Sequence, residues 1–293
     1  MKTFITALLL TVVCNCWCQQ SVTFPVVLGE VPYNWKSIEK KVPRADVDRF
    51  INAFTKEFAA YRYSQEYPSG NLDSLANDLH FIDINADGKP DVIFDGQGPG
   101  EGRLIEVYIR NEKGYKKLLS EYQGITKIDW EGARIKRLYI YNWGCCADYT
   151  QTNKIFEINY NQSAPAVKQI YQSICILMTN QPAPDSLFQQ PIRFEVLNDK
   201  YNIRGEPKID DTAIYIWHAE TNKKIIDPGN TLGKLPLGST GTAFGKSTDA
   251  TGRVWWYVEM DLQYKPEKDV FYVGNNFPTR VIGWVSSRFV KVL

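Results

Sequence analysis

The sequence predicts a mainly β protein in which an α+β region is followed by a second, β-rich region. A single long helical period lies near the N-terminus, and short apolar runs fill most of the remaining chain. A polar segment with two prolines, residues 180–186, separates the two regions. A chain of 293 residues, of which 44% are hydrophobic, has room for about two domains with ordinary cores. We therefore expect two folded units.

One amphipathic helix is predicted at residues 43–61, with Pro43 at its start. Its apolar residues follow the spacing i, i+3, i+4, i+7, i+11 and i+14: Val47, Phe50, Ile51, Phe54, Phe58 and Tyr61. This spacing places them on one stripe of a helix. Because no other segment has so long a helical period, we expect the helix to pack on an antiparallel sheet.

The strands of that sheet are predicted between clusters of Gly, Asn and Asp, at residues 80–84, 92–94, 104–109, 134–141 and 154–160. Residues 169–178 fit either a last strand or a short helix. In the C-terminal region, short apolar strands are predicted at 254–260 and 281–285. The expected organisation is a signal peptide at 1–18, an α+β domain at 19–179, a linker at 180–190 and a β-rich domain at 191–293.

The charge balance excludes a strongly basic nucleic-acid binder, because 34 Lys and Arg stand against 33 Asp and Glu. Two histidines leave little material for a zinc site. We expect no nucleic-acid partner, and any recognition should come from local features of the surface.

The first residues predict export. Lys2 precedes an apolar run at 4–13, which is too short to span a bilayer, and cleavage after Cys18 would leave Gln19 first. We expect a periplasmic or extracellular protein without an integral membrane span. The alternative is a lipoprotein, although the residues before Cys14, Cys16 and Cys18 do not match a lipobox.

An acidic loop is the sharpest local signal in the chain. Oxygen-bearing side chains recur at alternate positions, Gly88 lies where the loop must turn, and the carbonyl of residue 89 adds a further oxygen. The candidate calcium ligands are Asp83, Asn85, Asp87, Lys89 and Asp91. With apolar residues on both sides, residues 81–93 resemble the calcium-binding loop of FG-GAP (VCBS) repeats, which implies a calcium ion that staples a hairpin. The alternative is a hairpin whose Asp and Asn side chains bind backbone amides without a metal.

Three cysteines remain after the signal peptide: Cys145, Cys146 and Cys175. In an oxidising compartment we expect one of the adjacent pair to form a disulfide with Cys175. Which of the two forms it stays open, and one thiol is left over.

The C-terminal region contains the segments 201–204, 232–238, 255–258 and 282–288, with the motifs Asn-Ile-Arg, Gly-Lys-Leu-Pro-Leu-Gly, Trp-Trp-Tyr-Val and Gly-Trp-Val in this order. This order resembles bacterial SH3 (SH3b) domains. The resemblance implies an SH3-like β-barrel that binds cell-wall peptides or proline-bearing chains through aromatic side chains. The candidate ligand-binding residues are Trp255, Trp256, Tyr257, Tyr272 and Trp284. Alternation along a strand requires part of this set to point into the core.

These features are compatible with two functions. The first is an exported, non-enzymatic binding or adaptor protein of the cell envelope, monomeric, whose partner is a cell-wall peptide or an envelope protein. The alternative is a cell-wall or glycan hydrolase that uses carboxylates such as Asp95, Glu101 or Asp148. No set of catalytic residues is evident in the sequence, so the first is the expected function.

Overall fold

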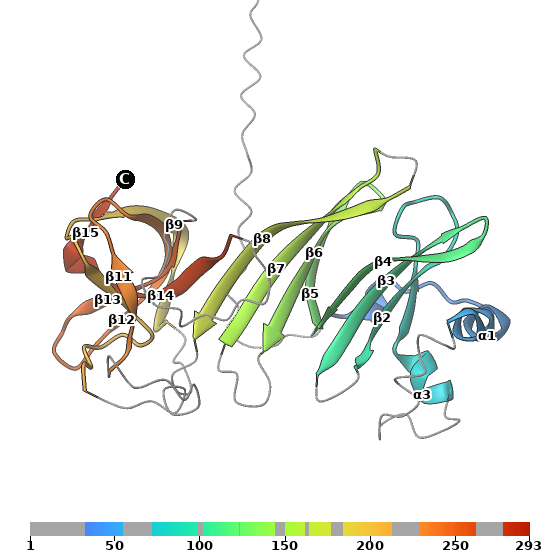
Figure 1. Cartoon of the computed structure of the whole chain (residues 1–293), viewed down its shortest axis with the longest axis horizontal. Coiled ribbons are helices and arrows are strands. Elements are labelled where there is room, and N and C mark those ends of the chain that lie inside the picture. Colours follow the sequence, from blue (N-terminus) through green and yellow to red (C-terminus); the bar gives the residue numbers. More distant parts are fainter. Residues whose placement is uncertain are drawn as a thin grey trace, which may run out of the picture.

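A computed structural model describes residues 33–54, 72–98, 102–122, 124–143, 150–161, 164–176, 184–212, 229–261 and 278–293. The described part of the chain is mainly β, as the sequence predicts (Figure 1). We refer to residues up to 176 as the N-terminal half and to residues from 184 as the C-terminal half.

The N-terminal half contains the helical elements η1 (Trp35–Ser37), α1 (Arg44–Ala53) and α3 (Leu72–Asn77). Its strands are β1 (Leu79–Ile82), β2 (Asp91–Gln97), β3 (Arg103–Asn111), β4 (Gly114–Tyr122), β5 (Gly124–Glu131), β6 (Arg134–Trp143), β7 (Thr150–Asn159) and β8 (Ala166–Ile176). The C-terminal half contains β9 (Ser186–Val196), β10 (Tyr201–Arg204), β11 (Thr231–Leu235), β12 (Thr240–Thr248), β13 (Val254–Met260), β14 (Arg280–Ser286), η2 (Ser287–Phe289) and β15 (Val290–Val292).

The N-terminal half has three layers. A four-stranded antiparallel sheet, in the order β1-β2-β3-β4, lies between α1 on one face and strands β5–β8 on the other. The alternation along its strands explains this: Val92 and Phe94 belong to the same buried cluster as Phe50 of α1, whereas Ile93 belongs to the cluster on the opposite face, with Ile140. The predicted packing of a helix on an antiparallel sheet is confirmed.

Helix α1 begins after Pro43 and ends at Ala53. Phe50 and Ile51 are buried, and the ring of Phe54 lies 4.9 Å from that of Phe50. The apolar stripe therefore packs as predicted over the described part. The remainder of the predicted helix, residues 55–61, lies outside the described residues.

The predicted strands of both halves are confirmed, and residues 169–176 belong to a strand, β8, whereas 177 and 178 lie outside the described residues. The strands that were not predicted from the sequence are β4, β5, β9, β10, β11, β12 and β15. Strand β4 lies at the edge of the small sheet and is largely exposed, so it lacks the apolar run on which the prediction depended.

A single eleven-stranded sheet crosses from one half to the other. Its order is β15-β9-β12-β13-β14-β8-β7-β6-β5, and β10 with β11 branches from β14. Strands β8 and β14 pair in parallel, through residues 173–175 and 280–282. Of the predicted linker, residues 184–190 are described, and β9 begins within them at Ser186, which pairs with Lys246 of β12.

The strands of the C-terminal half curl around a core formed by residues such as Phe194, Val258 and Val285 (Figure 1). Among the described residues, β15 and β11 are not paired with each other, so the sheet is not closed into a barrel. The closed SH3-like barrel stays a prediction.

Candidate functional site

The acidic loop connects β1 and β2, and its polar side chains bind the loop's own backbone. The two oxygens of Asp83 accept hydrogen bonds from the amides of Asp87 and Gly88, each at 3.0 Å. Asn85 Oδ1 accepts a bond from the amide of Asp87, also at 3.0 Å. Gly88 has a φ of 82°, which favours glycine. These hydrogen bonds from backbone amides to Asp83 and Asn85 are the ones expected for a hairpin without a metal.

Asp91 differs from the other candidate ligands because it is fully buried. Its Oδ2 accepts a bond from the amide of Ile84 at 2.8 Å, and its Oδ1 accepts one from the amide of Arg110 at 2.7 Å. Burial raises the pKa of Asp91 to about 7. The two backbone hydrogen bonds lower this pKa, and the negative charges of Asp87 and Asp83 raise it. The carboxyl group thus ties the loop to β3.

The donor chemistry of the loop fits a hard cation such as calcium. The side chains of Asp83, Asn85 and Asp87 supply oxygens, and Asp83 already contacts one cation, because Lys40 Nζ lies 3.0 Å from its Oδ2. Within the described ranges, no group of three or more His, Cys, Asp and Glu side chains is arranged to hold a metal ion. The carbonyl of Lys89 belongs to the same loop, and the amide of Lys89 binds Asp87 Oδ1 at 2.8 Å.

The aromatic candidates of the C-terminal half divide between two faces of the sheet. Trp255, Tyr257 and Trp284 pack together in one buried cluster, with the rings of Tyr257 and Trp284 5.1 Å apart. Trp256 packs against the core on the other face. Tyr272 lies outside the described residues. The set predicted from the sequence therefore does not form one surface, because neighbouring residues of β13 point in opposite directions.

The buried cluster contains both satisfied and unsatisfied polar atoms. Trp255 Nε1 donates to Asp249 Oδ2 at 2.9 Å. Burial raises the pKa of Tyr257 well above its usual value, and the neighbouring Cys175, to which it is hydrogen-bonded, adds to the rise. Among the described residues, Trp284 Nε1 and Ser286 Oγ are buried without a hydrogen-bond partner.

Trp256 is the only described member of the predicted set that is not fully buried. Its ring makes edge contacts with Phe188, at 5.8 Å between centroids, and with Phe194, at 6.2 Å. Phe188 is itself partly exposed, and the neighbouring Leu187 is 64% exposed. We call Phe188 and Trp256 the aromatic rim. Sequence reasoning missed Phe188 because β9 was expected to be partly linker.

Among the described residues, the candidate carboxylates for hydrolysis do not form a catalytic pair, because only Asp95 is described. Asp95 is buried, accepts a bond from Trp35 Nε1 at 2.7 Å and forms an ion pair with Arg103 at 2.6 Å. Both of its oxygens are thereby engaged in structural contacts. Glu101 and Asp148 lie outside the described residues.

The cysteines are only partly described. Cys175 is buried on β8, where it is the register partner of Gln151 in β7. Cys145 and Cys146 lie outside the described residues, shortly before β7, so the disulfide stays a prediction.

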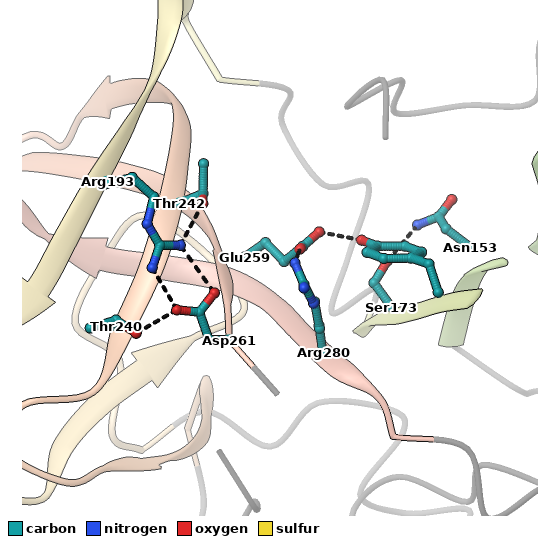
Figure 2. A network of polar contacts seen from close by, with 9 residues as sticks. Asn153, Ser173, Arg193, Thr240, Thr242, Glu259, Asp261 and Arg280 are labelled. Carbon is teal, nitrogen blue, oxygen red and sulfur yellow. Dashed lines mark hydrogen bonds and ion pairs between the residues drawn. The ribbon is translucent and has the colours of Figure 1, made fainter. Parts of the chain in front are cut away.

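A polar network joins the two halves where β8 meets the C-terminal strands (Figure 2). The hydroxyl of Tyr171 donates a short hydrogen bond to Glu259, and Arg280 Nη1 lies 2.7 Å from the other oxygen of Glu259. Beyond it, Arg193 forms a bidentate ion pair with Asp261, at 3.0 and 2.7 Å. Sequence reasoning had no signal for this network, because Tyr171 and Glu259 are 88 residues apart.

Neither the models of protein families nor the curated proteins and solved structures compared with this chain gave a match. In the part of the chain that the structure describes, no helix has the length and the hydrophobicity needed to cross a bilayer.

Proposed function

We propose that this chain is an exported, non-enzymatic binding or adaptor protein of the cell envelope. Its C-terminal half is an SH3-like module that binds a cell-wall peptide or an envelope protein, and its acidic loop is stapled by calcium. The mature protein begins at Gln19, acts as a monomer in the periplasm or outside the cell, and carries a disulfide between Cys175 and one of the two adjacent cysteines.

The aromatic rim carries this proposal. Trp256 combines edge contacts with Phe188 and Phe194 with partial exposure to solvent. A ring held in this way offers a large contact area to a partner and loses little conformational entropy on binding. The buried Trp255, Tyr257 and Trp284 support the strand that presents Trp256.

A co-sedimentation experiment with purified peptidoglycan tests the proposal on the mature full chain. Trp256→Leu should reduce the bound fraction at least about tenfold, since aromatic hot spots contribute about 2 kcal/mol or more. Trp130→Leu is the matched control, because Trp130 is 38% exposed but lies on β5 in the other half. Equal retention of both variants, or no retention of the wild type on sacculi and on wall peptides, would remove the cell-wall version of the proposal.

The calcium staple is tested separately by isothermal titration of the mature protein with calcium chloride. Asp83, Asn85 and Asp87 supply the oxygens nearest the loop surface, so Asp87→Ala should abolish the binding heat. Asp129→Ala, which changes a carboxylate on β5, should leave it intact. Absence of heat in the wild type at millimolar calcium would end this part of the proposal.

A further inference from the structure

The described residues contain three copies of one arrangement, in which a tyrosine hydroxyl donates to a carboxylate that also pairs with a cation lying over the tyrosine ring. In the first, Tyr108 donates to Glu106 at 2.6 Å and Lys117 lies 2.7 Å from Glu106. The Lys117 ammonium is 5.6 Å from the centre of the Tyr108 ring. The three contacts reinforce one another, because the cation neutralises the carboxylate and interacts with the ring.

The second copy has the same contacts within the large sheet. Tyr139 donates to Asp129 at 2.5 Å, Lys127 lies 2.9 Å from Asp129, and the ammonium is 4.5 Å from the Tyr139 ring. These two copies each connect adjacent strands of the N-terminal half, β3 with β4 and β5 with β6. They strengthen pairings that the strand connections already favour.

The third copy joins the two halves. Tyr171 of β8 donates to Glu259 of β13, Arg280 of β14 pairs with Glu259 at 2.7 Å, and its guanidinium lies 5.4 Å from the Tyr171 ring. The side chain of Tyr171 is therefore clamped by two residues of the C-terminal half. We call these three residues the junction triad.

Two further contacts lie beside the junction triad. Strand β8 pairs in parallel with β14 over only three residues of each strand. Gln172 Nε2 donates to Thr279 Oγ1 at 2.9 Å. Because this backbone pairing is short, side chains supply much of the contact between the halves. Ile174 and Cys175 of β8 belong to buried apolar clusters of the C-terminal half, and the triad supplies polar contacts beside them. Glu259 is 6% exposed and Tyr171 is 7% exposed, so loss of one member leaves buried polar groups without their partners.

We propose that the junction triad is a coupling device that makes the two halves open and close as one cooperative unit. A partner bound to the C-terminal half then stabilises the N-terminal sheet as well, because local openings on the two sides share one equilibrium. This goes beyond the proposed binding function, and it does not depend on the identity of the partner.

Native-state hydrogen exchange of the mature full chain, followed by mass spectrometry, tests the coupling. In the wild type, the slowest amides of β6 and those of β13 should have equal protection factors. Tyr171→Phe removes only the hydroxyl, and the protection factors of the two strands should then diverge about tenfold, the ratio that corresponds to about 1.4 kcal/mol.

Tyr139→Phe is the matched control, since it removes the same kind of hydroxyl bond within one half. It should lower the protection of β6 and β13 by the same factor. If Tyr171→Phe does not fold, Glu259→Gln serves in its place, because it keeps an acceptor for Tyr171 and removes the charge paired with Arg280. Unequal protection in the wild type, or an equal fall in both strands in the junction variant, would overturn the proposal.

Discussion

Two buried carboxyl groups in this protein are accommodated in opposite ways. Asp91, in the hairpin of the N-terminal half, is held by the backbone amides of Ile84 and Arg110. Glu259, at the junction, is held by the side chains of Tyr171 and Arg280. Burial raises the pKa of Asp91 to about 7 even though it accepts two backbone bonds. A buried acid that staples a local loop can rely on neutral donors, whereas one that joins distant strands here has a cation beside it.

Loss of the cation should produce the largest change. Arg280→Ala leaves the carboxylate of Glu259 buried without its ion-pair partner, and we expect the free energy of unfolding to fall by about 3 to 5 kcal/mol. Urea denaturation of the mature protein measures this through the midpoint at unchanged slope. Arg280→Lys keeps the charge and should lose less. A loss below about 1 kcal/mol for Arg280→Ala would show that the junction does not depend on this charge.

Removal of the other acid should have a somewhat smaller effect. Asp91→Ala leaves the amides of Ile84 and Arg110 buried without an acceptor, which should cost about 2 to 4 kcal/mol of folding free energy. Asp87→Ala, in the exposed part of the same loop, should cost less than about 1 kcal/mol. Urea denaturation of Asp91→Ala and Asp87→Ala measures this as the difference between their unfolding midpoints. Equal losses would mean that Asp91 is not the staple of the hairpin.

Alkaline pH should weaken the tyrosine contacts. Burial and the bond to Asp129 raise the pKa of Tyr139 to about 12, whereas an unfolded chain ionises tyrosine near pH 10. Between these two pH values the folded state keeps the hydroxyl proton and the unfolded state loses it. The free energy of unfolding therefore falls as the pH rises from about 10 towards 12.

For one such tyrosine the slope approaches about 1.4 kcal/mol per pH unit. Urea midpoints of the wild type and Tyr139→Phe at pH 9, 10 and 11 isolate this contribution, because the other titrating groups are common to both. A constant difference between the two proteins across this range would contradict the shift.

The smallest effect should come from a hydroxyl without a partner. Ser286 Oγ is buried, and its polar neighbour, the hydroxyl of Tyr201, does not reach it with hydrogen-bond geometry, so Ser286→Ala should be neutral or stabilising by up to about 1 kcal/mol. Ser173, also fully buried, accepts a bond from Asn153 at 3.2 Å, and Ser173→Ala should destabilise by about 1 kcal/mol. Thermal unfolding of the two variants shows whether each substitution raises or lowers the stability. A loss of stability in Ser286→Ala equal to that in Ser173→Ala would contradict the prediction and indicate a hydrogen bond at Ser286.

The features that could be predicted from the sequence are those in which near neighbours interact. The stripe containing Phe50 and Ile51 predicted α1, because a helix of this kind must bury one face. The acidic loop was predicted from the spacing of its oxygens, and its side chains do converge on nearby backbone amides. Alternation predicted that Trp255 and Trp256 would face opposite ways, although it did not say which would be open to solvent.

The missed features depend on position in the sheet. Strand β4 was not predicted because an edge strand exposes much of its length, and Lys116 and Lys117 interrupt its apolar pattern. The predicted linker at residues 180–190 overlaps the start of β9 at Ser186, and one sheet continues through both halves, whereas the division into two domains stays a prediction.

By itself, the sequence determined the mainly β class, the helix, about half of the described strands and the acidic loop, since each depends on periodicity or spacing within a short segment. Only the tertiary structure decided that β8 pairs with β14 and that Tyr171 meets Glu259 and Arg280. Contacts between residues 88 positions apart follow from how whole strands are placed, because the pairing of backbones brings them together and local preferences carry no information about it.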